Sequence, residues 1–498
     1  MNLQVHFQHF REQIIGHDLH LDHNGRQHPV IYADWTASGR LYRPIERYMQ
    51  EVVGPYVANT HTETTLTGAG MTHAYHEAQA QIKKHVNADE NDVIIADGAG
   101  MTSVINRLQR MLGLRIPDKW RSRIDLAEAE RPVVFLTHME HHSNQTTWEE
   151  CEVTVELIRA TPDGLPDLAH LRDRLDDYRN HPVKIGSFTA CSNVTGIITP
   201  IHEMAAIMHD CGGLCFVDFA ASAPYVDMDM HPADPKQNLD AVMFSPHKFL
   251  GGPGSSGILV FDRNLYQCRV PDRPGGGTVS WTNPWGEHRF FDDVETREDG
   301  GTPGFLQVIR AALAIRVKEA MGIDNMARRE KALTARLLDG LSSIPGVNIL
   351  EGEQRHRLCI VSFYIEGLHH NLVVRLLNDY YGIQSRGGCS CAGTYGHILL
   401  GVDEDRSHEI TARIDQGDLS DKPGWVRVSL HPTSTDEEAS RIVEAVRDVV
   451  SHGSKWARHY SFNRATGEYE PATPHRHPVR LDSFEPLETS PHNRFREA

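Results

Sequence analysis

The sequence predicts an α/β protein in which a large, mainly parallel sheet precedes a smaller α+β unit. Three observations lead to this prediction. Apolar, β-branched runs alternate with helical patterns from about residue 32 to 261, the alternation breaks between 269 and 303, and helical periodicity returns after it. Strands that alternate with helices form βαβ units, in which helices cover both faces of a parallel sheet. A chain of 498 residues can bury a large core in two or three domains.

The elements of the first unit can be read in chain order. Six apolar runs are expected to be strands: 92–97 (DVIIAD), 132–138 (PVVFLTH), 183–190 (VKIGSFTA), 214–219 (LCFVDF), 240–245 (DAVMFS) and 257–262 (GILVFD). Helices are expected at MTSVINRLQRML and from 202 to 209. The segment 269–303, rich in Gly, Pro, Trp and acidic residues, is expected to be an irregular functional loop or a subunit contact.

The second unit begins with two helices, at 306–321 and 326–342. Its expected strands are NILEG, CIVSFYI and VRVSL, and its later helices are expected at 370–378 and 436–451. The residues after Trp456 contain prolines, histidines and few aliphatic side chains, which predicts a loosely packed extension. The predicted organisation has four parts: an N-terminal segment 1–31, a large domain 32–305, a small C-terminal domain 306–455 and a polar tail 456–498.

Composition excludes some classes of protein. The net charge of -17, without a run of Lys and Arg, argues against a nucleic-acid partner. No signal h-region and no run of eighteen apolar residues is present, so no membrane association is expected. Eight scattered cysteines without a C-x-x-C pair do not form a disulfide framework, and they predict a reducing, cytoplasmic location.

A lysine and a carboxylate lie at expected strand ends. Lys248 follows the run DAVMFS on a glycine-rich turn, and Asp218 ends the run LCFV. Alone, Lys248 could equally be a solvated loop lysine. An aldehyde cofactor bound to a lysine, however, needs a carboxylate beside its pyridine nitrogen, and ligands bind at this edge of α/β sheets.

A phosphate site is expected close by. Residues 100–102 (Gly-Met-Thr), between a strand and a helix, offer N–H groups at a helix N-terminus and a hydroxyl. Ser245 and His247 supply further donors.

Eight motifs in a fixed order resemble one family. They are YADWTAS, GMTSVIN, MEHHSN, CSNVTG, VDFAAS, SPHK, GTP and RGGCSCAG. From about residue 32 to 451, the chain resembles the class V aminotransferases, which are pyridoxal phosphate (PLP) enzymes of fold type I. Within that family it is most similar to the group II cysteine desulfurases and selenocysteine lyases.

The resemblance implies how the cofactor is held. Lys248 matches the lysine that binds PLP covalently, Asp218 the partner of the pyridine nitrogen, and Asn193 the contact to the ring hydroxyl. His141 matches the residue that stacks on the ring and moves protons. The expected phosphate ligands are Gly100, Met101, Thr102, Ser245 and His247.

The resemblance also implies a substrate site and a dimer. Arg427 matches the arginine that binds the substrate carboxylate, a charge-assisted bond of roughly 1.5 to 3 kcal/mol. Ala37 is expected to contact the substrate. Thr302, in GTP, resembles a threonine that reaches the phosphate of the neighbouring subunit, which implies a homodimer with shared active sites.

Three features depart from the family. Ala221 stands where a glutamine is frequent, so one polar contact to the cofactor is missing or comes from another group. The usual Asn-Ala-Ala-Thr after the first aspartate is replaced by residues 35–38 (Trp-Thr-Ala-Ser), and we expect the indole of Trp35 to reshape the substrate pocket. An insertion at 397–425 is expected to cover the active site.

Cys389 and Cys391, one residue apart, admit four interpretations. They could be zinc ligands with His397, a strained and easily reduced disulfide, two loop thiols without chemistry, or a nucleophile with a second thiol. Counted from Arg386, Cys391 matches the nucleophilic cysteine of the group II desulfurases, which takes the substrate sulfur as a persulfide. We expect this role for Cys391, a second-thiol role for Cys389 and no metal site.

The expected function is therefore a PLP-dependent cysteine desulfurase that converts L-cysteine to L-alanine and passes sulfur to an acceptor, such as a carrier protein. The alternatives are an aminotransferase, lyase or epimerase of the same family without cysteine catalysis, and a binding protein that keeps the fold without turnover. Fold alone does not decide between them.

Overall fold

Seven strands form the central sheet of the computed structural model, which describes residues 2–23, 25–124, 126–472, 479–484 and 486. The strand order is β4-β10-β9-β8-β7-β5-β6, and only β10 runs antiparallel to its neighbours. The strands are β4 Asp92–Asp97, β5 Val133–Thr137, β6 Thr154–Ile158, β7 Lys184–Thr189, β8 Leu214–Asp218, β9 Ala241–Phe244 and β10 Gly257–Asp262. The predicted mainly parallel sheet is confirmed.

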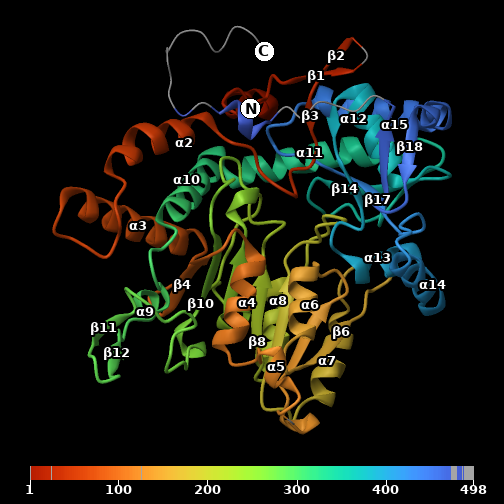
Figure 1. The fold of residues 1–498 in the computed structure, drawn as a ribbon. Helices are drawn as coiled ribbons and strands as arrows, with labels where there is room; N and C mark the ends of the chain where they lie inside the picture. Colours follow the sequence, from red (N-terminus) through yellow and green to blue (C-terminus); the bar gives the residue numbers. More distant parts are fainter. Residues whose placement is uncertain (1, 24, 125, 473–478, 485, 487–498) are drawn as a thin grey trace.

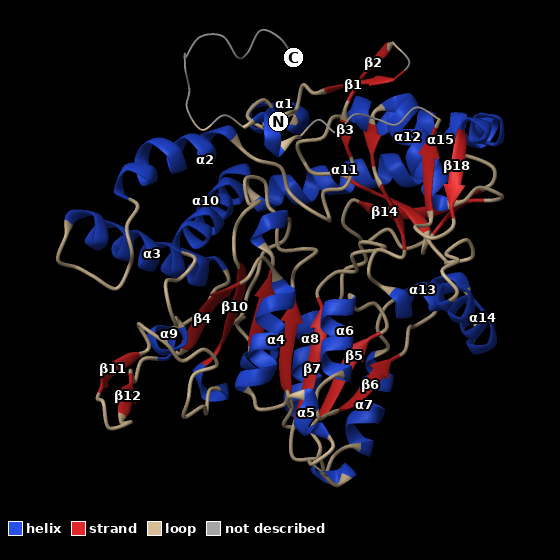
Figure 2. Ribbon diagram, viewed as in Figure 1, coloured by secondary structure: helices blue, strands red, loops and turns tan. Residues whose placement is uncertain are grey.

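Helices cover both faces of this sheet (Figure 2). They are α3 Leu66–His85, α4 Met101–Met111, α6 His142–Glu149, α7 Leu168–Asp177, α8 Ile201–Asp210 and α10 Phe305–Met321. The short helix α2 Arg43–Tyr48 packs against α10, and α5 Asp118–Arg121 lies at one end of the sheet. Because side chains alternate along a strand, β4 contributes side chains to two hydrophobic cores. Ile94 joins the core with α3, α8 and α10, whereas Val93 and Ile95 join the core with α4 and α6.

A second, antiparallel sheet of four strands follows, in the order β13-β14-β17-β16. Its strands are β13 Val347–Ile349, β14 Ile360–Ile365, β16 Arg386–Gly388 and β17 Trp425–Ser429. The helices α11 Ile323–Ser342, α12 His370–Tyr381 and α15 Asp436–Trp456 pack against it around a separate core. The proposed domain boundary near residue 305 stays a prediction, although the two sheets and cores differ as expected.

The N-terminal segment packs against this second unit (Figure 1). It contains α1 Leu3–Arg11 and the hairpin β1 His20–His23 and β2 Arg26–Pro29, and β3 Ile31–Tyr32 pairs with β15 Ile383–Gln384. An ion pair of 2.7 Å joins Arg11 of α1 to Glu438 of α15.

The segment 269–303 is more regular than its composition predicts. It forms a hairpin, β11 Val279–Thr282 and β12 His288–Phe290, followed by the short helix α9 Val294–Glu298. Figure 1 shows that the hairpin projects from the body of the molecule. Trp281 and Trp285 are 54% and 83% exposed on it. Because the segment forms a hairpin and a helix, its glycines and prolines mark turns rather than an irregular loop.

The prediction of a loosely packed tail is wrong for residues 457–472. They form a hairpin, β18 Tyr460–Asn463 and β19 Glu468–Pro471, whose tyrosines pack against the second core. Tyr460 also donates a hydrogen bond of 2.9 Å to the buried carboxylate of Asp379. Two aromatic side chains therefore compensate for the missing aliphatic residues. Most of the remaining tail lies outside the described residues.

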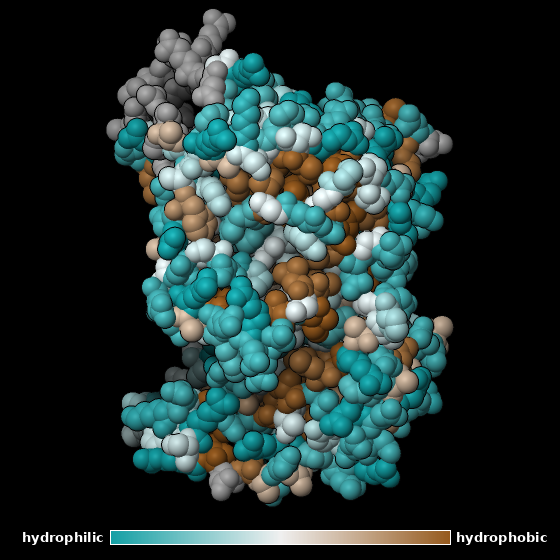
Figure 3. All heavy atoms as spheres, turned by 90° about the vertical axis from the view of Figure 1, so that its right-hand side faces the viewer, coloured by the Kyte–Doolittle hydropathy of each residue, from teal (hydrophilic) through white to brown (hydrophobic). Residues whose placement is uncertain are grey.

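The insertion adds the end of α13 Gly393–Leu400 and α14 Glu404–Asp415 at one side of the molecule. Figure 3 shows that side of the molecule, where brown apolar patches lie between polar margins. Ile398 of α13 is half exposed. In the part of the chain that the structure describes, no helix is both long and apolar enough to cross a membrane.

Candidate active site

A cavity of about 390 Å³ opens at the carboxyl ends of the central strands. Strand ends of a parallel sheet meet at one edge, so the residues that follow β5, β7, β8 and β9 converge there. The cavity collects almost all predicted site residues: Ala37, Gly100, Met101, Thr102, His141, Asn193, Asp218, Ser245, His247, Lys248, Cys391 and Arg427.

Lys248 and Asp218 are the oppositely charged pair of this cavity. Lys248 ends a 3₁₀ turn directly after β9, and burial lowers its pKa to about 8. Asp218 ends β8, and burial raises its pKa to about 6, while a 2.7 Å hydrogen bond from the Ala220 N–H opposes that shift. At neutral pH the cavity therefore holds an amine that loses its proton readily beside a mostly ionised carboxylate.

The lysine turn is fixed by a close backbone contact. The Gly39 N–H donates to the His247 carbonyl over 2.9 Å. A Cβ atom at Gly39 would lie 1.9 Å from the carbonyl oxygen of Phe249, so only glycine fits. This contact holds the turn against the strand ends and keeps Lys248 aimed into the cavity.

An anion site lies at the start of α4. Gly100 precedes the helix without a side-chain cap, and the Met101 N–H donates to Ser245 Oγ over 2.9 Å. Thr102 Oγ1 lies 2.6 Å from Ser143 Oγ. A Cβ atom at Gly100 would lie 3.0 Å from Ser245 Oγ and 3.5 Å from His247 Nε2. Hydroxyls, an imidazole and a helix N-terminus thus surround one small space, which suits a phosphate.

Two residues line the middle of the cavity. His141 caps α6, and its Nδ1 accepts from the Ser143 N–H over 3.1 Å. Burial, reinforced by Lys248, lowers the His141 pKa to about 3, so its imidazole is neutral. Asn193 donates from Nδ2 to the Ser390 carbonyl over 2.7 Å, while its Oδ1 is buried and unpaired within the structure. A buried acceptor without a donor indicates a ligand group at that position.

Two arginines share one carboxylate at the far end of the cavity. Arg386 and Arg427 lie opposite each other on β16 and β17, and Asp34 binds both, at 3.0 Å and 2.9 Å. Arg427 also donates to the Asn193 carbonyl over 2.9 Å. One carboxylate does not neutralise two guanidinium groups, so this end favours a further anion. The sequence analysis did not include Asp34, although it lies in the quoted YADWTAS motif.

The two cysteines lie on a strained loop. Ser390 and Cys391 have φ angles of 52° and 58°, in the left-handed region that non-glycine residues rarely adopt. The His142 N–H binds the Cys391 carbonyl over 2.8 Å, and the Gly393 N–H binds His142 Nε2 over 2.8 Å. Cys391 is exposed and lines the cavity, whereas Cys389 is half-buried and does not.

The zinc interpretation gains no support. His397 Nδ1 pairs with the Gly393 carbonyl at 2.8 Å, and its Nε2 pairs with Ser407 Oγ at 2.9 Å. Both ring nitrogens therefore have partners within the protein.

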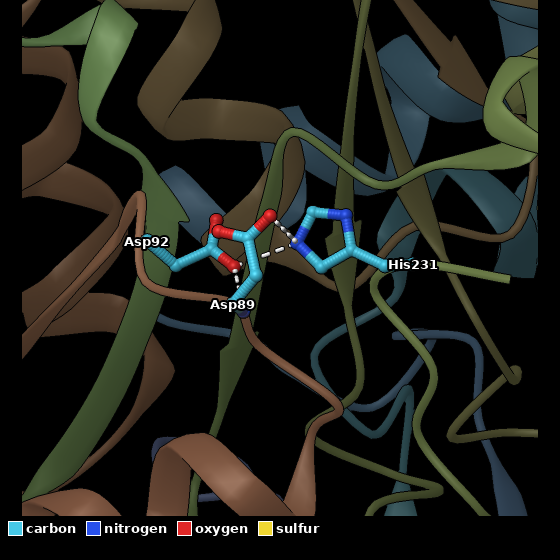
Figure 4. Close-up of side chains that lie close together, drawn as sticks. All are labelled: Asp89, Asp92 and His231. Atoms are coloured by element: carbon cyan, nitrogen blue, oxygen red, sulfur yellow. Dashed lines mark hydrogen bonds and ion pairs between the residues drawn. The ribbon is translucent and has the colours of Figure 1, made fainter.

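Among the described residues, one group of possible metal ligands converges, and it lies away from the cavity. Figure 4 shows Asp89, Asp92 and His231, whose carboxylate and imidazole groups point toward one another. His231 Nε2 is 2.7 Å from Asp92 Oδ2, and the Asp89 N–H donates to the same oxygen over 2.7 Å. These bonds stabilise the turn into β4 and explain the cluster without an ion.

Two predicted residues lie elsewhere. Thr302 does not line the cavity; its hydroxyl reaches Asn59 Oδ1 over 3.4 Å. Trp35 is buried and stacks on His431 with ring centroids 4.4 Å apart. The expectation that its indole reshapes the pocket is therefore wrong, because the large side chain packs into the core instead. Sequence reasoning assigned no role to eight lining residues. Six of them lie inside the quoted motifs and two outside; they are Thr36, Ser103, Ser143, Cys191, Ala220 and Ser390, and Ala99 and Thr189.

Solved structures share this fold. A cysteine desulfurase from Thermococcus onnurineus is 24% identical with a TM-score of 0.68, over 85% of this chain and 95% of that one. A cysteine desulfurase from Escherichia coli is 22% identical with a TM-score of 0.64, over 84% and 94%. The fold is that of the fold-type I PLP enzymes.

Sequence comparison assigns the family. The model of the family described as aminotransferase class-V matches residues 31–442, so the chain belongs to that family. A protein named "Probable cysteine desulfurase" from Staphylococcus aureus strain Mu50 is 28% identical over 373 residues, 74% of this chain and 84% of that protein. "Probable cysteine desulfurase 2" from Mycobacterium leprae is 29% identical over 363 residues, 72% and 77%.

Proposed function

We propose that this protein is a PLP-dependent cysteine desulfurase, which converts L-cysteine to L-alanine and takes the sulfur as a persulfide on Cys391. One observation carries the proposal: Cys391 lines the same cavity as Lys248, Asp218 and Arg427. A nucleophilic thiol, a cofactor-binding pair and a carboxylate-binding arginine thereby surround one space. The relatives named as cysteine desulfurases support the same activity.

The cavity suits PLP in three places. The space at the start of α4, bounded by Gly100, Ser245 and His247, would hold the phosphate. Asp218 would pair with the pyridine nitrogen, and the unpaired Asn193 Oδ1 would accept from the ring hydroxyl. His141 would lie against the ring. PLP in this site would supply an electron sink for the substrate's Cα electrons.

The chain's own groups would carry the remaining steps. Arg427 would bind the carboxylate of L-cysteine and orient the amino acid. Lys248, whose amine has a lowered pKa, would move the Cα proton. The thiolate of Cys391 would attack the substrate sulfur, forming a new S–S bond while the Cβ–S bond breaks and alanine leaves.

Two further features belong to the proposal. Thr302, outside the cavity of its own chain and exposed beside Asn59, would reach the phosphate of a second subunit in a homodimer with shared sites. The scattered thiols of the sequence support a cytoplasmic location.

The test is to add L-cysteine to the PLP-loaded protein and to quantify alanine and sulfide over time. We expect alanine in step with sulfide in the wild type, loss of both in Cys391→Ser, and substantial activity in Cys389→Ser. Cys389→Ser is the matched control, because it removes a thiol from the same loop. Loss in Cys389→Ser instead would assign the nucleophile to Cys389. No alanine in the wild type, despite bound PLP, would favour an aminotransferase, lyase or epimerase of the family.

A further inference from the structure

A second pocket lies on the other side of the cysteine loop. Its volume is about 260 Å³, and it shares Arg386, Ser390 and Cys391 with the inner cavity. We call it the outer pocket; its remaining walls are the start of α12, residues 419–423 of the insertion and the turn 466–468 between β18 and β19. Cys389 lines the outer pocket but not the inner cavity. Cys391 therefore borders both spaces.

The walls of the outer pocket are joined by specific contacts. Asn371 Nδ2 of α12 donates to the Gly467 carbonyl over 2.8 Å, and the Leu419 N–H donates to the Arg464 carbonyl over 2.9 Å. A Cβ atom at Gly424 would lie 2.6 Å from His370 Cε1 and 2.8 Å from Gly388 Cα. The insertion, the hairpin and the cysteine loop thus form one packed wall rather than a gap between mobile loops.

The hairpin that closes the pocket lies beyond the family match. That match ends at residue 442, whereas β18 and β19 span 460–471. The outer pocket is therefore completed by a part of this chain that the family model does not include.

Charge in the outer pocket favours an anion. Arg386 and Lys422 line it, against one carboxylate, Glu468. Because Arg386 is already paired with Asp34, Lys422 is the cation that is available to a ligand. Among the described residues, Lys422 Nζ has no hydrogen-bond or ion-pair partner within reach, and the start of α12 adds the positive end of a helix dipole. Burial lowers the pKa of His370 to about 3 and also lowers that of His369, so both imidazoles are neutral and leave this balance unchanged.

A buried polar group also lacks a partner where the two spaces meet. Ser390 is 9% exposed, and its Oγ has no hydrogen-bond partner within the structure. Because buried hydroxyls are normally paired, this group indicates a ligand atom at the junction beside Cys391.

We propose that the outer pocket binds the acceptor of the persulfide sulfur, and that this acceptor is a small thiol that carries a carboxylate. This inference rests on the proposed function. The acceptor's carboxylate lies beside Lys422, and its thiolate reaches the outer sulfur of the Cys391 persulfide. Since the backbone of Cys391 is held by His142, rotation of the side chain alone moves the sulfur from the inner cavity to the outer pocket.

The transfer balances without another reagent. The acceptor thiolate attacks the outer sulfur, and a new S–S bond forms on the acceptor while the bond between Cys391 Sγ and that sulfur breaks. The electron pair of the broken bond stays on Sγ, which returns as a thiolate. The acceptor leaves as a persulfide, and the inner cavity keeps its contents throughout.

The experiment separates the two half-reactions. The PLP-loaded enzyme is mixed with one equivalent of L-cysteine per site, alanine is measured, and the persulfide on Cys391 is located by mass spectrometry. After small molecules are removed, 3-mercaptopropionate, 2-mercaptoethanol or cysteamine is added, and the rate of persulfide loss is compared per thiolate. We expect the anionic thiol to react fastest.

Variants at Lys422 test the pocket. We expect Lys422→Glu to reduce the rate with 3-mercaptopropionate by about five- to tenfold, as reversal of one exposed charge predicts, and to leave 2-mercaptoethanol within about twofold. Glu468→Lys should strengthen the preference for the anionic thiol, and Lys422→Arg should retain that preference. Lys331→Glu, on α11, is the control for the change in net charge. About 0.5 M salt should shrink the difference.

Three outcomes overturn the proposal. The wild type could show no preference for the anionic thiol, the preference could persist in Lys422→Glu, or none of the thiols could react faster than with a persulfide on free cysteine. If the preference persisted in Lys422→Glu, the thiol would attack in the inner cavity, beside Arg427. If no thiol reacted faster than with a persulfide on free cysteine, a protein acceptor would be favoured.

Failure of the proposed function gives a different result. In that case no alanine forms in the first step. Cys391 is then converted to the persulfide with inorganic polysulfide, and the same comparison of thiols and variants tests the outer pocket alone.

Discussion

Lys248 and Cys391 line one cavity, but the chain holds them in different ways. Lys248 follows a buried strand, and a glycine contact that admits no Cβ atom fixes its turn. Cys391 is exposed on a loop with two successive left-handed residues, and it borders a second pocket. The difference follows from what each group must meet. A lysine that keeps its cofactor can be enclosed, whereas a thiol that passes sulfur onward must be reached from two sides.

The largest effect is expected at the enclosed side. Lys248→Ala should remove the visible absorbance of bound PLP and lower alanine formation by about a thousandfold or more, because the covalent attachment and the base are both lost. Absorbance spectra and alanine assays measure the two losses. If the absorbance remained, Lys248 would not be the attachment point.

Arg427→Lys tests the end of the cavity that faces the cysteine loop. We expect the KM for L-cysteine to rise by roughly 10- to 100-fold, since an ammonium group cannot bind Asp34, the Asn193 carbonyl and a substrate carboxylate together. PLP absorbance should remain, because the change lies in the substrate half. Lys331→Arg, which exchanges the same two residue types at an exposed position outside the cavity, is the control and should leave the KM unchanged. An unchanged KM would contradict the substrate role of Arg427.

The pH dependence of PLP uptake sharpens the comparison. Only the neutral amine of Lys248 reacts with an aldehyde, and its pKa is lowered to about 8. The initial rate of PLP uptake by the apoprotein should therefore rise with pH and level off above about pH 8. Asp218 raises the pKa of Lys248, so Asp218→Asn should move the plateau to lower pH. Stopped-flow absorbance checks this; a rise that continues toward pH 10 would contradict it.

The smallest effect is expected at the wall of the outer pocket. Asn371→Ala removes the hydrogen bond to Gly467 and should lower the free energy of unfolding by about 1 kcal/mol. Amide exchange should increase in the 460–471 hairpin, while the amount of alanine formed from one equivalent of L-cysteine stays unchanged. Urea titration and hydrogen exchange measure both. A hairpin as protected as in the wild type would mean that the tyrosines alone hold it in place.

The enclosed side could be predicted from the sequence because strand ends and glycine turns leave local patterns. Asp218 and Lys248 both follow apolar runs, and Gly100 precedes a periodic helix. The open side could not be predicted in this way. Asp34 meets Arg386 and Arg427 only through pairing of distant strands, and the 460–471 hairpin depends on tyrosines that fill a remote core. The prediction for Trp35 was wrong for the same reason, because the direction of its side chain depends on stacking with His431, far along the chain.

The two left-handed residues of the cysteine loop bear on how this gene would respond to random mutation. Each non-glycine side chain in that conformation costs roughly 1 to 2 kcal/mol relative to glycine. Under selection for stability alone, glycine would be favoured at both Ser390 and Cys391. A lineage selected for sulfur transfer through the outer pocket would keep the thiol at 391 and the hydroxyl at 390, so glycine at either codon would reveal that selection for stability had prevailed.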